Sequence, residues 1–88
     1  MKAVITVVGK DRPGILAFVA TKCAEKSVSI VDVTQKVLQD LFTMIMIVEL
    51  PEGYALDEMA STFEELGNQE GLKIYVMQED IFNAMHTI

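Results

Sequence analysis

The sequence predicts an α+β fold in which a four-stranded antiparallel sheet carries two helices on one face and a short helical tail follows. Strand-like apolar segments alternate with segments of helical spacing in the order βαβ, twice over, in halves of similar length. The length of 88 residues suits one hydrophobic core, because two cores would each be too small to be stable. We therefore expect a single domain over residues 1–88.

Residues 3–8 are predicted to form the first strand, because nearly all of them are apolar and most are β-branched. Residues 9–14 contain two glycines and a proline and therefore predict a loop. The next helix is expected to begin at Pro13, since proline suits a first helical turn, and to end near Lys26. Its apolar face comprises Ile15, Leu16, Val19, Ala20 and Cys23. Phe18 lies off this face, where a single domain offers it little to pack against, so we predict that it contributes to a subunit contact or to the wall of a ligand site.

Residues 28–38 and 42–50 predict two further strands that are joined by a hairpin at Gln39 and Asp40. The earlier strand alternates polar with apolar residues, which is typical of a half-exposed strand. The later one is apolar on both sides, with Phe42, Met44, Met46 and Val48 on one side and Thr43, Ile45 and Ile47 on the other. Helices on one face of a sheet cover only one of these sides. We therefore expect a homodimer or larger oligomer and predict Ile45 and Ile47 as interface residues.

The second half of the chain repeats the pattern of the first. Met59, Phe63 and Leu66 have helical spacing, and Gly71 is a suitable end for that helix. Residues 72–79 predict the last strand, and residues 79–88 form a tail with Ile81, Met85 and Ile88 on one helical face, expected to dock on the sheet or on a neighbouring chain. Two βαβ units joined by a hairpin give the ferredoxin-like arrangement.

Charge and composition exclude several classes of protein. Seven basic and thirteen acidic residues give a net charge of −6, which repels phosphate backbones, so we expect no nucleic-acid partner. The most apolar stretch, residues 41–50, is about half as long as a bilayer requires, so we expect no membrane span. A lone cysteine and a start without a signal cleavage site suggest a cytoplasmic protein. Nothing in the sequence indicates a metal or a cofactor.

Catalytic residues are poorly represented. The one histidine, His86, lies close to the C-terminus, and Cys23 lies on an apolar helix face, where it is expected to be a core residue. We therefore do not expect an enzyme. Residues 9–14, by contrast, lead from a strand to a helix N-terminus, whose free N–H groups favour a small carboxylate. The alternative interpretation of this loop is an ordinary strand-to-helix turn.

The segment Val7-Val8-Gly9-Lys10-Asp11-Arg12-Pro13-Gly14-Ile15 resembles the opening of an ACT domain, a regulatory module that binds small molecules and whose first strand typically ends in a D-R-x-G loop. Residues 28–35, 42–46 and 79–86 are similar to short bacterial and archaeal ACT proteins, and glycine cleavage repressor-like proteins are more distant relatives. The resemblance implies that an amino acid binds between two ACT domains. By position, the implied site comprises Asp11, Arg12, Pro13, Gly14, Ser29 and Ile30, and the helix N-terminus adds the backbone of Ile15. Two positions depart from the family pattern, because Ser29 replaces a usual Asn and Ser27 replaces a common Gly.

Two functions fit these observations. One is an amino-acid-binding regulatory module that acts through another protein, which the sequence does not identify. The other is a ligand-free assembly module with the same fold. An acylphosphatase-like hydrolase would also place an arginine, here Arg12, in the first loop, but it requires an asparagine on the central hairpin and residues 42–50 contain none. RNA binding would require paired aromatic residues and basic surroundings, and a metal carrier would require a Cys-x-x-Cys loop.

Overall fold

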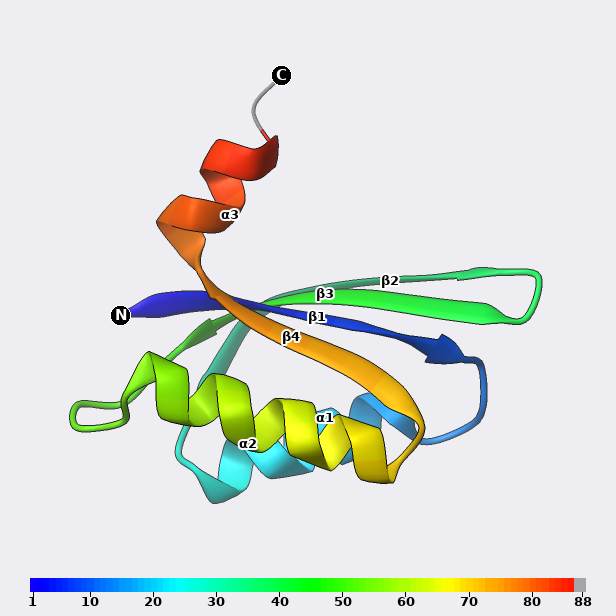
Figure 1. The fold of residues 1–88 in the computed structure, drawn as a ribbon, viewed down its shortest axis with the longest axis horizontal. Coiled ribbons are helices and arrows are strands. Elements are labelled where there is room, and N and C mark those ends of the chain that lie inside the picture. Colours follow the sequence, from blue (N-terminus) through cyan, green and yellow to red (C-terminus); the bar gives the residue numbers. More distant parts are fainter. Residues whose placement is uncertain (87–88) are drawn as a thin grey trace.

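The computed structural model describes residues 1–86, and of His86 only the backbone. The helices and strands are β1 (Lys2–Lys10), α1 (Ile15–Glu25), β2 (Ser29–Leu38), β3 (Leu41–Glu49), α2 (Leu56–Gln69), β4 (Leu72–Gln78) and α3 (Glu79–His86). Figure 1 shows α1 and α2 together on one side of the sheet and α3 on the other. This arrangement confirms the predicted ferredoxin-like fold with a helical tail.

The described strands form a four-stranded antiparallel sheet in the order β2-β3-β1-β4. The strand β1 is central and pairs with β3 along its whole length, from Lys2 opposite Glu49 to Lys10 opposite Leu41. Its other edge pairs with β4, from Ala3 opposite Gln78 to Gly9 opposite Leu72. The outer strands β2 and β4 each leave one edge without a strand beside it in the described chain.

The core lies between the sheet and the two helices α1 and α2. Alternate residues of β1 and β3 point into it, and they are Ala3, Ile5 and Val7 together with Phe42, Met44, Met46 and Val48. The helices contribute Ile15, Val19 and Cys23 from α1 and Met59 and Phe63 from α2. The two sides that were predicted for β3 are therefore confirmed, because Ile45 and Ile47 lie on the face that α1 and α2 do not cover. We call this the open face.

The first helix begins later than predicted. Gly14 is its N-cap residue with φ 91° and ψ 2°, so Pro13 lies before the helix and not within its first turn. Glycine adopts this left-handed conformation at little cost, whereas other residues avoid it. Phe18 is half-buried and packs against the core, so a single domain does offer it a contact. Its role at a subunit contact or a ligand site stays a prediction. The end of the helix lies within one residue of the prediction.

The strand β2 is more exposed than a half-buried strand would be. Val33 is half-buried and the other residues of β2 are exposed, because the β2–β3 hairpin extends beyond the helices in Figure 1. The predicted alternation also breaks at Val31, since Ile30 pairs with Val48 and Asp32 with Ile47. Val31 is thus the extra residue of a bulge, a feature typical of edge strands.

The tail forms α3, which packs against β1 and β4 on the open face. Val4 points to this face and is only 1% exposed, although it lies outside the main core cluster. The predicted contact between the tail and the sheet is therefore present within one chain. Ile88 and the side chain of His86 lie outside the described residues.

Close packing of α2 on β4 depends on Gly67. A Cβ atom at this position would lie 2.9 Å from the carbonyl oxygen of Leu72 and 2.8 Å from Cγ1 of Ile74. We predict that Gly67→Ala lowers the free energy of unfolding by about 1–2 kcal/mol, because overpacking outweighs the better helix propensity of alanine. Urea denaturation measures the change. The matched control Ser61→Ala lies on an exposed part of α2 and should change stability by less than about 0.5 kcal/mol. A Gly67→Ala protein as stable as the wild type would contradict the close approach.

Candidate functional site

The loop between β1 and α1 is held at two points. The N–H of Asp11 donates to the carbonyl oxygen of Asp40 in the β2–β3 turn at 2.7 Å. Nη2 of Arg12 donates to the carbonyl oxygen and to Oε1 of Glu70, at 3.1 and 3.2 Å. The loop is therefore fixed both to the hairpin and to the end of α2.

The N-terminus of α1 is open to a ligand. The carbonyl of Gly14 accepts the first helical hydrogen bond, from the N–H of Phe18 at 2.9 Å. By helix geometry, the N–H groups of Ile15, Leu16 and Ala17 then lack partners within the helix. The first turn carries no acidic residue, no side chain caps it, and nothing lies within 4 Å of where a Gly14 Cβ atom would be. The unpaired N–H groups and the helix dipole favour a carboxylate or another small anion here.

Each predicted residue of this loop takes a distinct position. Asp11, Arg12, Pro13 and Gly14 are exposed, whereas the side chain of Ile15 is buried in the core, so Ile15 offers only its backbone to a ligand. Arg12 is occupied by Glu70, and both side chains are about two-fifths exposed. A pair this exposed contributes less than about 1 kcal/mol to stability. Its geometric effect is to complement the C-terminal carbonyls of α2 and to hold the loop in place.

Ser29 and Ile30 lie far from this loop within one chain. Ser29 is opposite Glu49, which is opposite Lys2, whereas the loop follows Lys10 at the other end of β1. Eight residues of extended strand separate these ends by about 26 Å. Both Ser29 and Ile30 are exposed. The structure thus brings Asp11 to Ile15 together and leaves Ser29 and Ile30 at the opposite end of the sheet.

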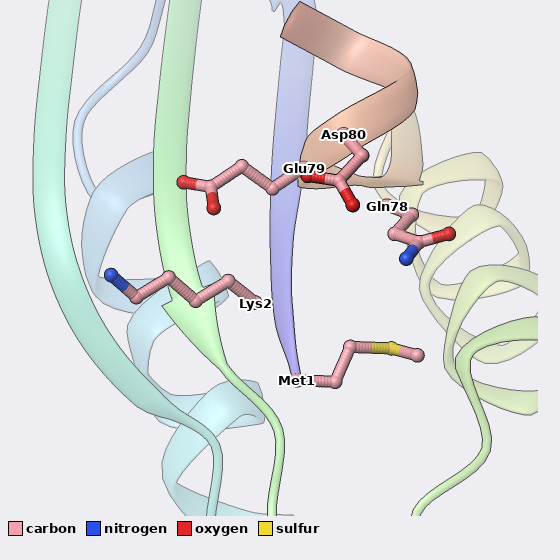
Figure 2. A pocket seen from close by; sticks show the side chains of 5 residues that line it. All are labelled: Met1, Lys2, Gln78, Glu79 and Asp80. Atoms are coloured by element: carbon pink, nitrogen blue, oxygen red, sulfur yellow. The ribbon is translucent and has the colours of Figure 1, made fainter.

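A hollow of about 370 Å³ occurs where β1 begins and α3 leaves the sheet. Figure 2 shows its lining, which is Met1, Lys2, Gln78, Glu79 and Asp80. The side chains of Lys2 and Glu79 extend to one side of β1, and those of Met1 and Gln78 extend to the other. The terminal ammonium of Met1 nearby is bound by Glu49, and this hydrogen bond lowers the pKa of the Glu49 carboxyl. Because the charged groups do not converge on one point, this hollow is a weaker candidate than the loop.

Cys23 is fully buried, and its burial raises the pKa of the thiol to about 11. The thiol is therefore protonated at neutral pH and is not a nucleophile. Across residues 1–86, no three histidine, cysteine, aspartate or glutamate side chains are grouped so as to hold a metal ion. None of the helices in that range is long and apolar enough to cross a bilayer.

Comparison with known proteins agrees with the topology of the sheet and helices. Residues 2–77 match the family model described as the ACT domain. The chain belongs to the ACT domain family. A UPF0237 protein of Streptococcus mutans is 46% identical over 88 residues, which is all of both chains. A UPF0237 protein of Methanococcus maripaludis is 46% identical over 86 residues and covers 97% of this chain and 96% of that protein.

Solved structures place this ACT domain among similar folds. An ACT domain protein from Streptococcus pneumoniae has a TM-score of 0.85 and 39% identity, over 100% of this chain and 97% of that one. A putative glycine cleavage system transcriptional repressor has a TM-score of 0.73 and 29% identity, over 85% of this chain and 43% of that one. ACT domains are usually regulatory modules that bind small ligands.

Two features of the site were not predicted from the sequence. No pattern in the sequence indicates that Arg12 pairs with Glu70, which lies 58 residues later. None indicates the hydrogen bond from the N–H of Asp11 to the carbonyl oxygen of Asp40 either. The left-handed N-cap at Gly14 did have a signal, because a glycine directly before an apolar helical face is a frequent start of a helix. The preference of proline for a first helical turn predicted a start at Pro13 instead.

The protonated thiol of Cys23 predicts a loss of stability in alkali. Near pH 9 the thiol of the unfolded chain begins to lose its proton, whereas the folded chain keeps it until about pH 11. The free energy of unfolding should therefore fall by about 2–3 kcal/mol more in the wild type than in Cys23→Ala between pH 8 and pH 11. Urea denaturation at a series of pH values measures both curves. Parallel curves would contradict the raised pKa.

Proposed function

We propose that this ACT domain is a non-catalytic regulatory module that binds an amino acid between two copies of the chain and signals through another protein. The observation that carries the proposal is the position of the two halves of the site. The loop from Asp11 to Gly14 and the start of β2 at Ser29 lie at opposite ends of one sheet. A single chain therefore cannot bring them to one ligand, whereas two antiparallel copies can.

The edge of β2 suits such a pairing. It is an outer strand, and its exposed apolar residues include Ile30, Val31, Val37 and Leu38. If two β2 strands pair antiparallel, the start of one strand lies beside the end of the other. That end is the hairpin turn, and the bond from Asp11 to Asp40 holds the β1–α1 loop next to it. Ser29 and Ile30 of the second copy would then approach the loop of the first.

The groups at this place complement an amino acid. The free N–H groups at the start of α1 suit its carboxylate, at about 1 kcal/mol for each hydrogen bond. Asp11 suits its ammonium group, and the hydroxyl of Ser29 from the second copy is both a donor and an acceptor. The pairing of Arg12 with Glu70 keeps these groups in position and leaves the carboxylate to the backbone.

The buried, protonated Cys23 and the absence of any partner cysteine agree with a reducing compartment, so we assign the protein to the cytoplasm. The likeness to a putative transcriptional repressor supports a regulatory role. The second candidate function is the ligand-free assembly module. Its support is that Arg12, the one cation in the loop beyond Lys10, is already paired with Glu70.

Ligand binding is tested by titrating labelled protein with the common amino acids. We predict saturable shifts of the amide signals of residues 11–17 and 28–30 at millimolar concentration or below. Gly14→Val should abolish them, because its side chain would cover the free N–H groups. Gly53→Val is the matched control, since Gly53 also has a positive φ, 85°, and open space around it but lies in another loop. Absence of specific shifts with every amino acid would favour the assembly module.

Pairing along β2 is tested by the mass in solution. Val37 is exposed on this edge, so we predict that Val37→Glu, which places a charge beside the exposed apolar residues at the start of the second copy's β2, halves the mass and weakens amino-acid binding at least tenfold. Ser61→Glu adds the same charge to an exposed position on α2 and should change neither property. Sedimentation equilibrium measures the mass. A Val37→Glu protein with unchanged mass and binding would contradict the shared site.

A further inference from the structure

The helix α3 projects from the open face of the sheet, away from the rest of the molecule (Figure 1). It has eight residues, which is too short for a stable helix in water without packing. Contacts with its own chain cover only part of the surface of α3. Phe82 and Met85 face Tyr75, Met77 and Thr6 across a groove of about 280 Å³.

The groove leaves apolar side chains of α3 exposed. Ile81 is 51% exposed, and Met85 is 70% exposed although it lines the groove. Their spacing of four residues places them on one stripe of the helix. Large apolar side chains on a projecting short helix indicate a surface that another element covers. This surface belongs to α3 and is separate from the β2 edge described above.

The open face has hollows in which such a helix can pack. Beside the groove under α3 lies a second hollow of about 200 Å³, over β1, β2 and β3. Thr6 lines both, so the two hollows are neighbours on the open face, and we call them together the trough. Exposed Ile45 and half-buried Val8 line the second part, and Lys36 is the one charged side chain among the described residues that line it.

We infer that this trough receives α3 of a second copy, so that two chains associate face to face and exchange their C-terminal helices across a two-fold axis. A projecting apolar helix and an apolar trough lie on the same face. Around a two-fold axis, α3 of each copy can therefore occupy the trough of the other copy. Their charges are opposite in sign. The described charged residues of α3 are Glu79 and Asp80, and its outer end carries the negative end of the helix dipole, whereas the trough carries Lys36.

This association is independent of ligand binding and does not use the β1–α1 loop. Of β2 it uses side chains that line the trough, such as Lys36, and not the outer backbone edge. If both surfaces operate, the protein contains four chains, a mass four times 9.8 kDa. If only the open face operates, the mass is twice 9.8 kDa. In either case, disruption of the helix exchange should halve the mass.

The test measures the mass of three variants by sedimentation equilibrium at micromolar concentration. The double variant Ile81→Asp, Met85→Asp should halve it, and so should Ile45→Asp, which changes the receiving trough and leaves α3 intact. Asn83→Asp, on the opposite side of α3, adds charge to the same helix and should keep the mass of the wild type. Circular dichroism checks that each variant is folded.

The outcomes separate this inference from the proposed function. Halved mass with unchanged amino-acid shifts at residues 11–17 supports the helix exchange and leaves the β2 pairing intact. Wild-type protein at 9.8 kDa, or unchanged mass in both Ile81→Asp, Met85→Asp and Ile45→Asp, overturns the inference. A single chain whose α3 amides are nevertheless protected from hydrogen exchange also overturns it, since α3 would then need no second copy.

Discussion

Pairing of the central strand β1 along both of its edges is the constraint on which the remaining architecture depends. Its core-facing residues Ala3, Ile5 and Val7 are fully buried, and its register with β3 is continuous from end to end. This register fixes where the β1–α1 loop and the start of β2 lie. The proposed division of the candidate site between two chains thus rests on strand geometry and not on the loop itself.

The periodicity of apolar residues was sufficient to predict the order of the elements, the fold and the two sides of β3, because each of these depends on local pattern and on burial. Three features depended on contacts between distant residues. The bulge at Val31 requires the register with β3, Arg12 meets Glu70 only after α2 has packed, and Phe18 reaches the core from outside the apolar stripe of α1. The predicted start of α1 was wrong for a local reason, since the sequence allows the helix to begin at either Pro13 or Gly14.

The two proposed contact surfaces are of different kinds: one is the outer edge of β2, and the other is the open face of the sheet with α3. Contacts along β2 extend a sheet through backbone hydrogen bonds, whereas contacts at α3 bury side chains. A ligand bound between two copies would stabilise the edge contact by mass action and would leave the face contact unchanged. Under the proposed function, the protein reports the concentration of an amino acid as a change in assembly.

The position of β1 also has a consequence for folding during synthesis. This strand leaves the ribosome well before its partners, because Ala3 pairs with both Val48 and Gln78. The sheet therefore cannot close until residue 78 has emerged, and until then a strongly apolar strand lacks a partner on at least one edge. Pairing between residues so far apart in the sequence is slow, because the entropy of loop closure is lost before the stabilising contacts form. A nascent chain of this kind is expected to need protection from aggregation until its last strand is available.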